Sequence, residues 1–175
     1  MNLIEKANSI YLKHFKPETC FERAIFFSWY CETKDCKFCF MSTQPHKPLA
    51  RRTTASILAE IILCKKLGWD IGFVSGGHGA YTTVEFKDLL EKINIIAKEK
   101  LWVNIGALNK DELQQFLPYI KGVVASIETI NPEIHEKVCP SKPIKPFEDM
   151  LDHATELNLK KAVTIILGLG ETIDD

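Results

Sequence analysis

The sequence predicts an α/β fold in which parallel strands alternate with helices. Two observations support this class. Short apolar runs rich in Ile, Val and Phe, which is the pattern of buried strands, recur along the chain. Longer segments with apolar residues at helical spacing lie between them. This alternation implies right-handed βαβ units and a parallel sheet, and no linker or low-complexity segment interrupts it.

The helices are recognised by apolar spacing and by the residues that begin or end helices. Thr82 and Glu85 form a predicted capping box, Asn109 and Asn131 are predicted N-caps, and Gly68 is a stop signal. The expected helices, in chain order, cover residues 3 to 15, residues 54 to 67, and segments after Thr82, after Asn109, after Asn131 and around 147 to 157.

The strands are recognised as apolar runs followed by polar or glycine residues. They are expected at residues 24–29, 70–74, 101–105, 123–127 and 162–167. In parallel α/β folds, ligand sites gather at the carboxyl ends of the strands. The segments that follow these strands are therefore the first place to look for chemistry.

Length and composition limit the class of protein. The chain has 175 residues, enough for one domain with a core, and its net charge of −1 argues against nucleic acid or an anionic membrane surface as partner. No run approaches the ~18 apolar residues of a membrane span, and the first residues carry charges where a signal peptide is apolar. Clustered cysteines without a disulfide framework suit a reducing compartment, so we expect a cytoplasmic protein.

Three cysteines follow the first predicted strand. Cys31, Cys36 and Cys39 lie within nine residues. Thiols grouped this tightly are metal or cluster ligands more often than disulfide partners. A closed zinc site or an electron-transfer cluster takes four ligands, so three leave one metal position open to bind and act on a molecule.

Further unusual residues lie at the ends of the second, fourth and fifth predicted strands or directly after them. They are the run Ser75, Gly76 and Gly77, the pair Ser126 and Glu128, and the residues Ile166 and Gly168. Glycines allow close approach of the backbone to a small ligand, and their carbonyls can accept from an ammonium group. A carboxylate at a strand end can accept hydrogen bonds from hydroxyl groups.

Together, these motifs resemble the N-terminal part of radical SAM enzymes, and more narrowly their biotin-synthase-like branch. The usual cluster loop of that family is Cys-x3-Cys-x2-Cys, whereas this chain has Cys-x4-Cys-x2-Cys. The resemblance implies that Cys31, Cys36 and Cys39 hold a [4Fe–4S] cluster. The fourth iron would bind the amino and carboxylate groups of S-adenosylmethionine (SAM), and Phe38 would pack near the adenine.

The resemblance also implies roles for the other motifs. Ser75, Gly76 and Gly77 would hold the methionyl amino group of SAM, with His78 standing where the family usually has Glu. Ser126 and Glu128 would contact the ribose. The strand carrying Ile166 and Gly168 would pass the adenine by backbone and apolar contact, and Glu171 would be structural.

The implied activity is reductive cleavage of SAM to a 5′-deoxyadenosyl radical that abstracts hydrogen from a small-molecule substrate, with an electron from a reducing partner such as flavodoxin or ferredoxin. The implied fold is a partial (β/α) barrel of about five βα units over residues 23–175, preceded by a lead-in helix within 1–22. A family core has six units and this branch closes eight. We therefore expect a second chain or a further C-terminal part to complete the barrel.

Other interpretations of the cysteines remain open. Cys64 could complete a ferredoxin-like [2Fe–2S] site, and His46 or Cys139 could complete structural zinc. An electron-transfer or scaffold protein without SAM turnover is the alternative function. His78 is either a local hydrogen-bonding residue or a ligand contact, and Cys139 either a plain thiol or a substrate-facing group or radical partner. Cys20 is expected to be structural.

Overall fold

The computed structural model describes residues 2–18, 21–43 and 50–175, and it contains one five-stranded parallel sheet in the order β1-β2-β3-β4-β5. The sequence-based prediction of a parallel α/β fold is confirmed. The strands are β1 (Glu22–Phe26), β2 (Asp70–Ser75), β3 (Leu101–Asn104), β4 (Ile120–Glu128) and β5 (Lys160–Ile165).

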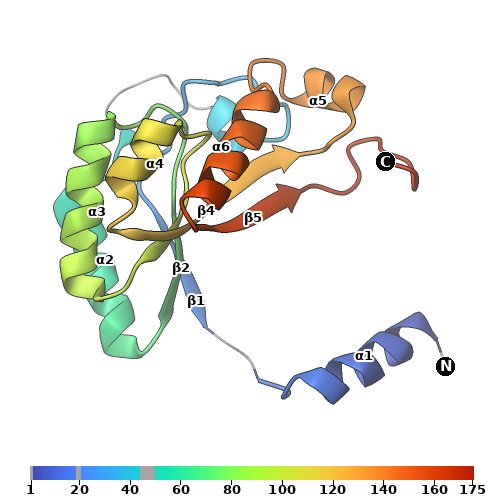
Figure 1. Cartoon of the computed structure of the whole chain (residues 1–175), viewed down its shortest axis with the longest axis horizontal. Coiled ribbons are helices and arrows are strands. Elements are labelled where there is room, and N and C mark those ends of the chain that lie inside the picture. The colour runs from blue at the N-terminus through green and yellow to red at the C-terminus, as the bar shows by residue number, and fades with distance from the viewer. Residues whose placement is uncertain (1, 19–20, 44–49) are drawn as a thin grey trace.

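The helices that connect the strands form a layer beside the sheet (Figure 1). Successive members of this layer contact one another, α2 with α3, α3 with α4, and α4 with α6. A sheet whose strands follow chain order through right-handed crossovers places its helices on one face in this way. The helices are α1 (Leu3–His14), α2 (Thr54–Leu67), α3 (Thr83–Ala97), α4 (Lys110–Phe116), α5 (Pro132–Val138) and α6 (Lys145–Glu156), with a short 3-10 turn η1 (Phe40–Thr43).

Local signals explain where these helices begin and end. Thr82 and Asn109 each form a reciprocal capping box, with Glu85 and Glu112 respectively. Helix α2 ends at Gly68, whose φ of 69° is the left-handed conformation that glycine adopts without strain. The predicted caps and stop are therefore observed.

One apolar core lies between the sheet and the helix layer. It is built by the inward faces of α2, α3, α4 and α6 and by alternate residues of the strands. Burial of these apolar side chains contributes about 25 cal/mol of stabilising free energy per Å² of apolar surface, and it is the main force that holds the helices on the sheet. Its largest fully buried side chains include Phe27, Phe116, Ile25, Ile57, Ile61, Leu89, Leu90, Ile93, Leu101 and Leu113.

Three strands begin earlier than predicted. The strand expected at 24–29 is β1 at Glu22–Phe26, the strand expected at 123–127 is β4 at Ile120–Glu128, and the strand expected at 162–167 is β5 at Lys160–Ile165. After β1, Trp29 N–H donates to the Ala50 carbonyl and Arg52 N–H to the Phe27 carbonyl. The apolar run after β1 therefore leaves the parallel sheet and pairs with the chain that closes the cysteine loop.

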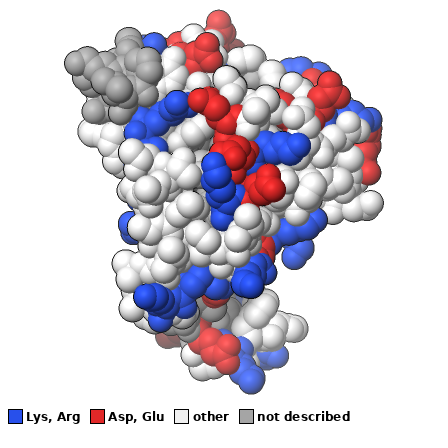
Figure 2. Space-filling model, turned by 90° about the vertical axis from the view of Figure 1, so that its left-hand side faces the viewer, with Lys and Arg blue, Asp and Glu red and all other residues white. Residues whose placement is uncertain are grey.

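Helix α1 lies away from the sheet in Figure 1, and none of its residues is buried. Strand β5 is an exposed edge of the sheet. It carries Val163 and Ile165, which are 48% and 55% exposed. Figure 2 shows a face on which Lys and Arg are interspersed with Asp and Glu. Among the described residues, no helix is both long and apolar enough to cross a membrane.

Candidate functional site

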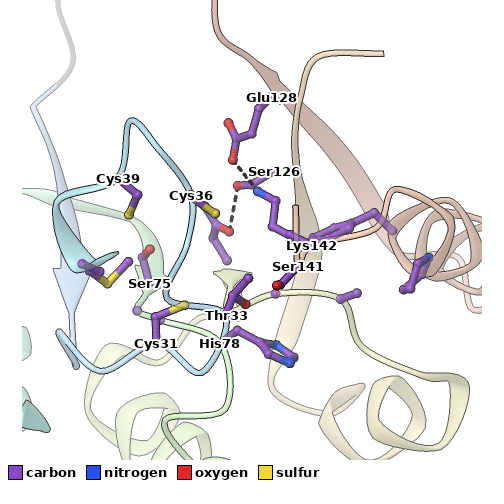
Figure 3. Close-up of a pocket in the computed structure, with 18 of the residues that line it drawn as sticks. Cys31, Thr33, Cys36, Cys39, Ser75, His78, Ser126, Glu128, Ser141 and Lys142 are labelled. Carbon is purple, nitrogen blue, oxygen red and sulfur yellow. Dashed lines mark hydrogen bonds and ion pairs between the residues drawn. The ribbon is translucent and has the colours of Figure 1, made fainter. Parts of the chain in front are cut away.

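A pocket with a volume of about 410 Å³ lies at the carboxyl ends of the strands (Figure 3). This is within the range of about 300–1,000 Å³ that small-molecule and cofactor sites occupy. The segments after β1, β2, β3 and β4 all contribute to its wall. Nine residues singled out in the sequence line it: Cys31, Cys36, Phe38, Cys39, Ser75, Gly76, Gly77, Ser126 and Glu128.

Backbone hydrogen bonds fix the cysteine loop from two sides. Glu32 N–H donates to the His78 carbonyl at 2.8 Å, which ties the loop to the end of β2. Lys37 N–H donates to the Val138 carbonyl at 2.8 Å, which ties it to the end of α5. The loop is thus held between the second and fourth βα units, with its thiols toward the pocket.

The glycine pair after β2 is needed for close packing against this loop. A Cβ on Gly77 would lie 1.9 Å from the Tyr30 carbonyl oxygen, and a Cβ on Gly76 would lie 2.4 Å from the Phe27 ring. Neither approach is possible for a residue with a side chain unless the backbone moves. The sequence interpretation assigned these glycines to contact with a ligand, and the structure adds contact with the cysteine loop.

The amides of the glycine pair are already used within the protein. Gly76 N–H donates to the Asn104 carbonyl at 3.3 Å and Gly77 N–H to the Ser28 carbonyl at 3.4 Å. Within the described ranges, the carbonyls of Gly76 and Gly77 accept no hydrogen bond. These two oxygens are therefore free to accept from a donor in the pocket.

The three cysteines differ in environment. Cys31 and Cys39 are half-buried, whereas Cys36 is buried against Cys139 and Val138. Burial raises the pKa of Cys36 to about 12, with the neighbouring Cys139 adding to the shift and Lys142 opposing it. A bare thiolate is unfavourable at this position, so ligation there requires a cation that takes the place of the proton.

A buried ion pair stands across the pocket from the cysteine loop. Lys142 Nζ lies 2.6 Å from Glu128 Oε1, and the two side chains are only 16% and 10% exposed (Figure 3). Glu128 has a φ of 71°, a left-handed conformation that is unusual for a residue other than glycine, and strained positions of this kind cluster at functional sites. Burial, with the Lys142 charge, lowers the pKa of the adjacent His135, which keeps this imidazole neutral at pH 7.

Several pocket residues were missed by sequence reasoning. Asn104 ends β3, and its Oδ1 accepts from Ser126 Oγ at 3.2 Å, so the rule that sites gather at strand ends could have found it. Ser141 and Lys142 come from the irregular segment between α5 and α6, where no periodicity or motif marks them. His78, whose role was left open, is exposed and also lines the pocket.

Two predicted residues lie outside this pocket. Ile166 is tied to the site only through its N–H, which donates to the Glu128 carbonyl at 2.8 Å. Among the described residues, Gly168 has no neighbour within 4 Å of where a Cβ would stand. Glu171 accepts from the N–H groups of Gly168, Leu169 and Gly170, so it organises its own turn, as the structural interpretation expected.

The alternative ligand sets find little support. Cys64 is 2% exposed inside the core under α2 and does not line the pocket, which removes the proposed fourth ligand of a ferredoxin-like site. In residues 2–18, 21–43 and 50–175, no three His, Cys, Asp or Glu side chains converge on a point where one metal ion could be held, so zinc completed by Cys139 lacks a site. His46 and Cys20 lie outside the described residues.

The same thiols fit a cluster better than a single ion. Each thiolate of a [4Fe–4S] cluster binds a different iron, so the sulfurs surround a volume and do not converge on one point. Cys31, Cys36 and Cys39 are arranged around one pocket on one loop. In that loop, Asp35 Oδ1 is buried and has no hydrogen-bond partner among the described residues, so part of the loop's polar chemistry is not used by the fold.

The fold and this pocket define a class: a parallel α/β protein with three thiols and a glycine pair at the carboxyl ends of its strands. The family model that describes the radical SAM superfamily matches residues 29–175. The chain therefore belongs to the radical SAM superfamily.

Two further similarities concern a sequence relative and a solved structure with a similar fold. The chain is 43% identical to the uncharacterized protein MJ0597 of Methanocaldococcus jannaschii over 97% of its own length and 48% of that protein. Its fold is similar to the crystal structure of methylornithine synthase (PylB), with a TM-score of 0.83 and 18% identity, over 97% of this chain and 51% of that one. The chain thus spans about half the length of each of these two proteins. The partial-barrel fold predicted from sequence is confirmed.

Proposed function

We propose that the pocket binds a [4Fe–4S] cluster through Cys31, Cys36 and Cys39, together with SAM. The bound pair would supply reductive cleavage of SAM to a 5′-deoxyadenosyl radical, which acts on a small-molecule substrate. Superfamily membership indicates an enzyme. The observation that carries the proposal is that one pocket is lined by three cysteines of one loop and by Gly76 and Gly77, whose carbonyls accept no hydrogen bond from the described residues.

The charges and polar groups of the pocket suit the two ends of the methionyl group. The free carbonyls of Gly76 and Gly77 can accept from an ammonium group. Lys142 carries a positive charge at the pocket and can pair with a carboxylate, in competition with Glu128. Acceptors for an ammonium group and a cation for a carboxylate thus stand in the same cavity.

The remainder of the pocket suits the nucleoside. Phe38 is 41% exposed at the pocket, which leaves its ring free to pack on an adenine. Ser126 and Glu128 provide oxygen acceptors at the end of β4 for ribose hydroxyls. Ile166 and Gly168 remain proposed adenine contacts, reached through the backbone link between Ile166 and Glu128.

The wider assignment is also part of the proposal. We place the chain in the biotin-synthase-like branch and in the cytoplasm, with an electron from a flavodoxin or ferredoxin. Residues 1–22 would form a lead-in segment and residues 23–175 a partial barrel. A C-terminal part or a second chain would extend the sheet beyond the exposed edge of β5 and complete the substrate cavity.

The test is anaerobic reconstitution, with iron and sulfide measured per chain and EPR spectra of the reduced cluster recorded before and after SAM is added. About four irons and a spectrum that shifts with SAM are expected, because three ligands leave one iron open. Cys31→Ala should lose most of the iron, whereas Cys64→Ala should keep it. About two irons, or a spectrum indifferent to SAM, would contradict the proposal, the latter favouring an electron-transfer or scaffold protein.

Two glycine-to-alanine variants separate the effect of packing against the cysteine loop from a general effect on the stability of the strand. Gly77→Ala should reduce cluster loading several-fold, because its Cβ would meet the Tyr30 backbone. Gly72→Ala, in the strand that precedes Gly77, is the matched control, since its Cβ would meet the flexible Glu22 side chain at 3.0 Å. Equal loading of the two variants would show that the close approach is dispensable.

A further inference from the structure

A fourth cysteine lies against the cysteine loop, in addition to the three proposed ligands. Cys139 is 1% exposed and packs with Cys36 and Val138 in a small cluster separate from the main core. Cys36 and Cys139 are neighbours in this cluster, close enough for each thiol to shift the pKa of the other. A buried thiol beside a proposed ligand sulfur is a position from which the electronic state of a cluster can be altered.

The backbone holds these two cysteines in place. Lys37 N–H, one residue after Cys36, donates to the carbonyl of Val138, one residue before Cys139. Cys139 N–H donates to the His135 carbonyl at 2.7 Å, and the Cys139 carbonyl accepts from Lys142 N–H at 3.0 Å. The contact between the thiols is therefore fixed by main-chain bonds on both sides of Cys139.

We propose that Cys139 is a positioning residue that donates an S–H···S hydrogen bond to the ligand sulfur of Cys36 and raises the reduction potential of the cluster. This inference rests on the proposed function. When Cys36 ligates iron it has given up its proton, so the hydrogen bond between the two sulfurs requires Cys139 as donor. Hydrogen bonds to cluster sulfurs stabilise the more negative reduced state and are among the factors that set cluster potentials.

The consequence concerns electron entry. A cluster that must be reduced before SAM is cleaved accepts an electron more readily when its added negative charge is stabilised by a nearby donor. Lys142 and the carboxylates of Asp35 and Glu128 are the charged groups around Cys139, and their opposite signs offset one another in part. The S–H group of Cys139 would then be the contact that acts directly on the Cys36 sulfur and on the reduction potential of the cluster.

The test is a redox titration of the reconstituted cluster, followed by EPR, in Cys139→Val and Cys139→Ser variants. Valine fills the site without a donor, and serine restores a donor. At the wild-type midpoint, Cys139→Val should lower the ratio of reduced to oxidised cluster about tenfold, equivalent to about 59 mV for a one-electron couple. Cys139→Ser should stay close to wild type.

The same two substitutions at Cys64 are the matched control. Cys64 is equally buried but lies in the core beneath α2, so these variants should cost stability and leave the potential unchanged. Equal shifts for Cys139→Val and Cys139→Ser, or none, would overturn the proposal. So would a Cys36→Ala variant that keeps a full cluster, because Cys139 would then be a substitute ligand.

Failure of this inference about Cys139 can be distinguished from failure of the proposed function. Iron content and the response to SAM in the wild-type protein test cluster and SAM binding. The order of potentials among the Cys139 variants tests the hydrogen bond. A protein that binds cluster and SAM while all variants share one potential would retain the proposed function and lose this inference.

Discussion

At the scale of single residues, the pocket holds a buried ion pair whose loss should be costly. Lys142→Met would leave the Glu128 carboxylate without its cation at a side-chain exposure of 10%. Removing one member of such a pair leaves an uncompensated charge, and we expect a loss of about 2–3 kcal/mol in the free energy of unfolding, measured by urea denaturation.

Lys145→Met is the control for that variant. Its partner Asp149 is one helical turn away, and the two side chains are 71% and 49% exposed, so the loss should be below about 0.5 kcal/mol. Equal losses in the two variants would show that solvent screens the Glu128–Lys142 pair as well as it screens the surface pair.

Individual site residues differed in how far the sequence revealed them. The cysteines and glycines were found because their chemistry and spacing are unusual and because they follow predicted strands. Lys142 was not found, since a lysine in an irregular loop looks like any solvated surface lysine. Its role follows only from the long-range folding that brings the segment after α5 against Glu128.

At the scale of elements, the capping box of α3 fixes the start of the helix that follows the glycine pair. Thr82 Oγ1 accepts from Glu85 N–H, and Glu85 Oε2 accepts from Thr82 N–H at 2.9 Å. Thr82→Ala should lower the free energy of unfolding by about 1 kcal/mol, since a helix N-terminal amide loses its acceptor.

Thr82→Ser serves as the rescue, because it keeps the hydroxyl acceptor, and it should recover most of the stability in the same urea titration. A Thr82→Ala variant as stable as wild type would mean that water replaces the cap without cost. The measurement is independent of cluster loading, so it can be made on the cluster-free protein.

Helix boundaries were predictable because capping residues are local signals, whereas several strand boundaries were not. The run from Ile25 to Trp29 is apolar except for Ser28, so its composition does not mark where parallel pairing with β2 stops. That boundary depends on a distant segment, Ala50 to Arg52, which supplies the pairing partner after β1. Strand β5 likewise takes its register from β4 and not from its own composition.

At the scale of the whole molecule, the edge of β5 should govern association of the 175-residue chain. An exposed parallel edge carrying Val163 and Ile165 is a template for pairing with another chain. Sedimentation over a range of concentrations should show self-association, and Val163→Lys combined with Ile165→Lys should suppress it.

Val84→Lys is the matched control, since Val84 is 74% exposed on α3, away from the sheet edge. It should leave association unchanged. A wild-type chain that stays monomeric at every concentration would show that the β5 edge is protected without a partner. The class of fold was predictable at this scale because strand and helix alternate along the entire chain.

The hydrogen bond between Lys37 and Val138 has a consequence for how the protein is made. The two residues are about 100 positions apart, so the contact closes a long loop and forms late relative to local structure. During synthesis from the N-terminus, the three thiols emerge well before the segment that completes their surroundings. Loading of the proposed cluster is therefore expected to follow the folding of α5, and a nascent chain that stalls earlier would carry its cysteines without their pocket.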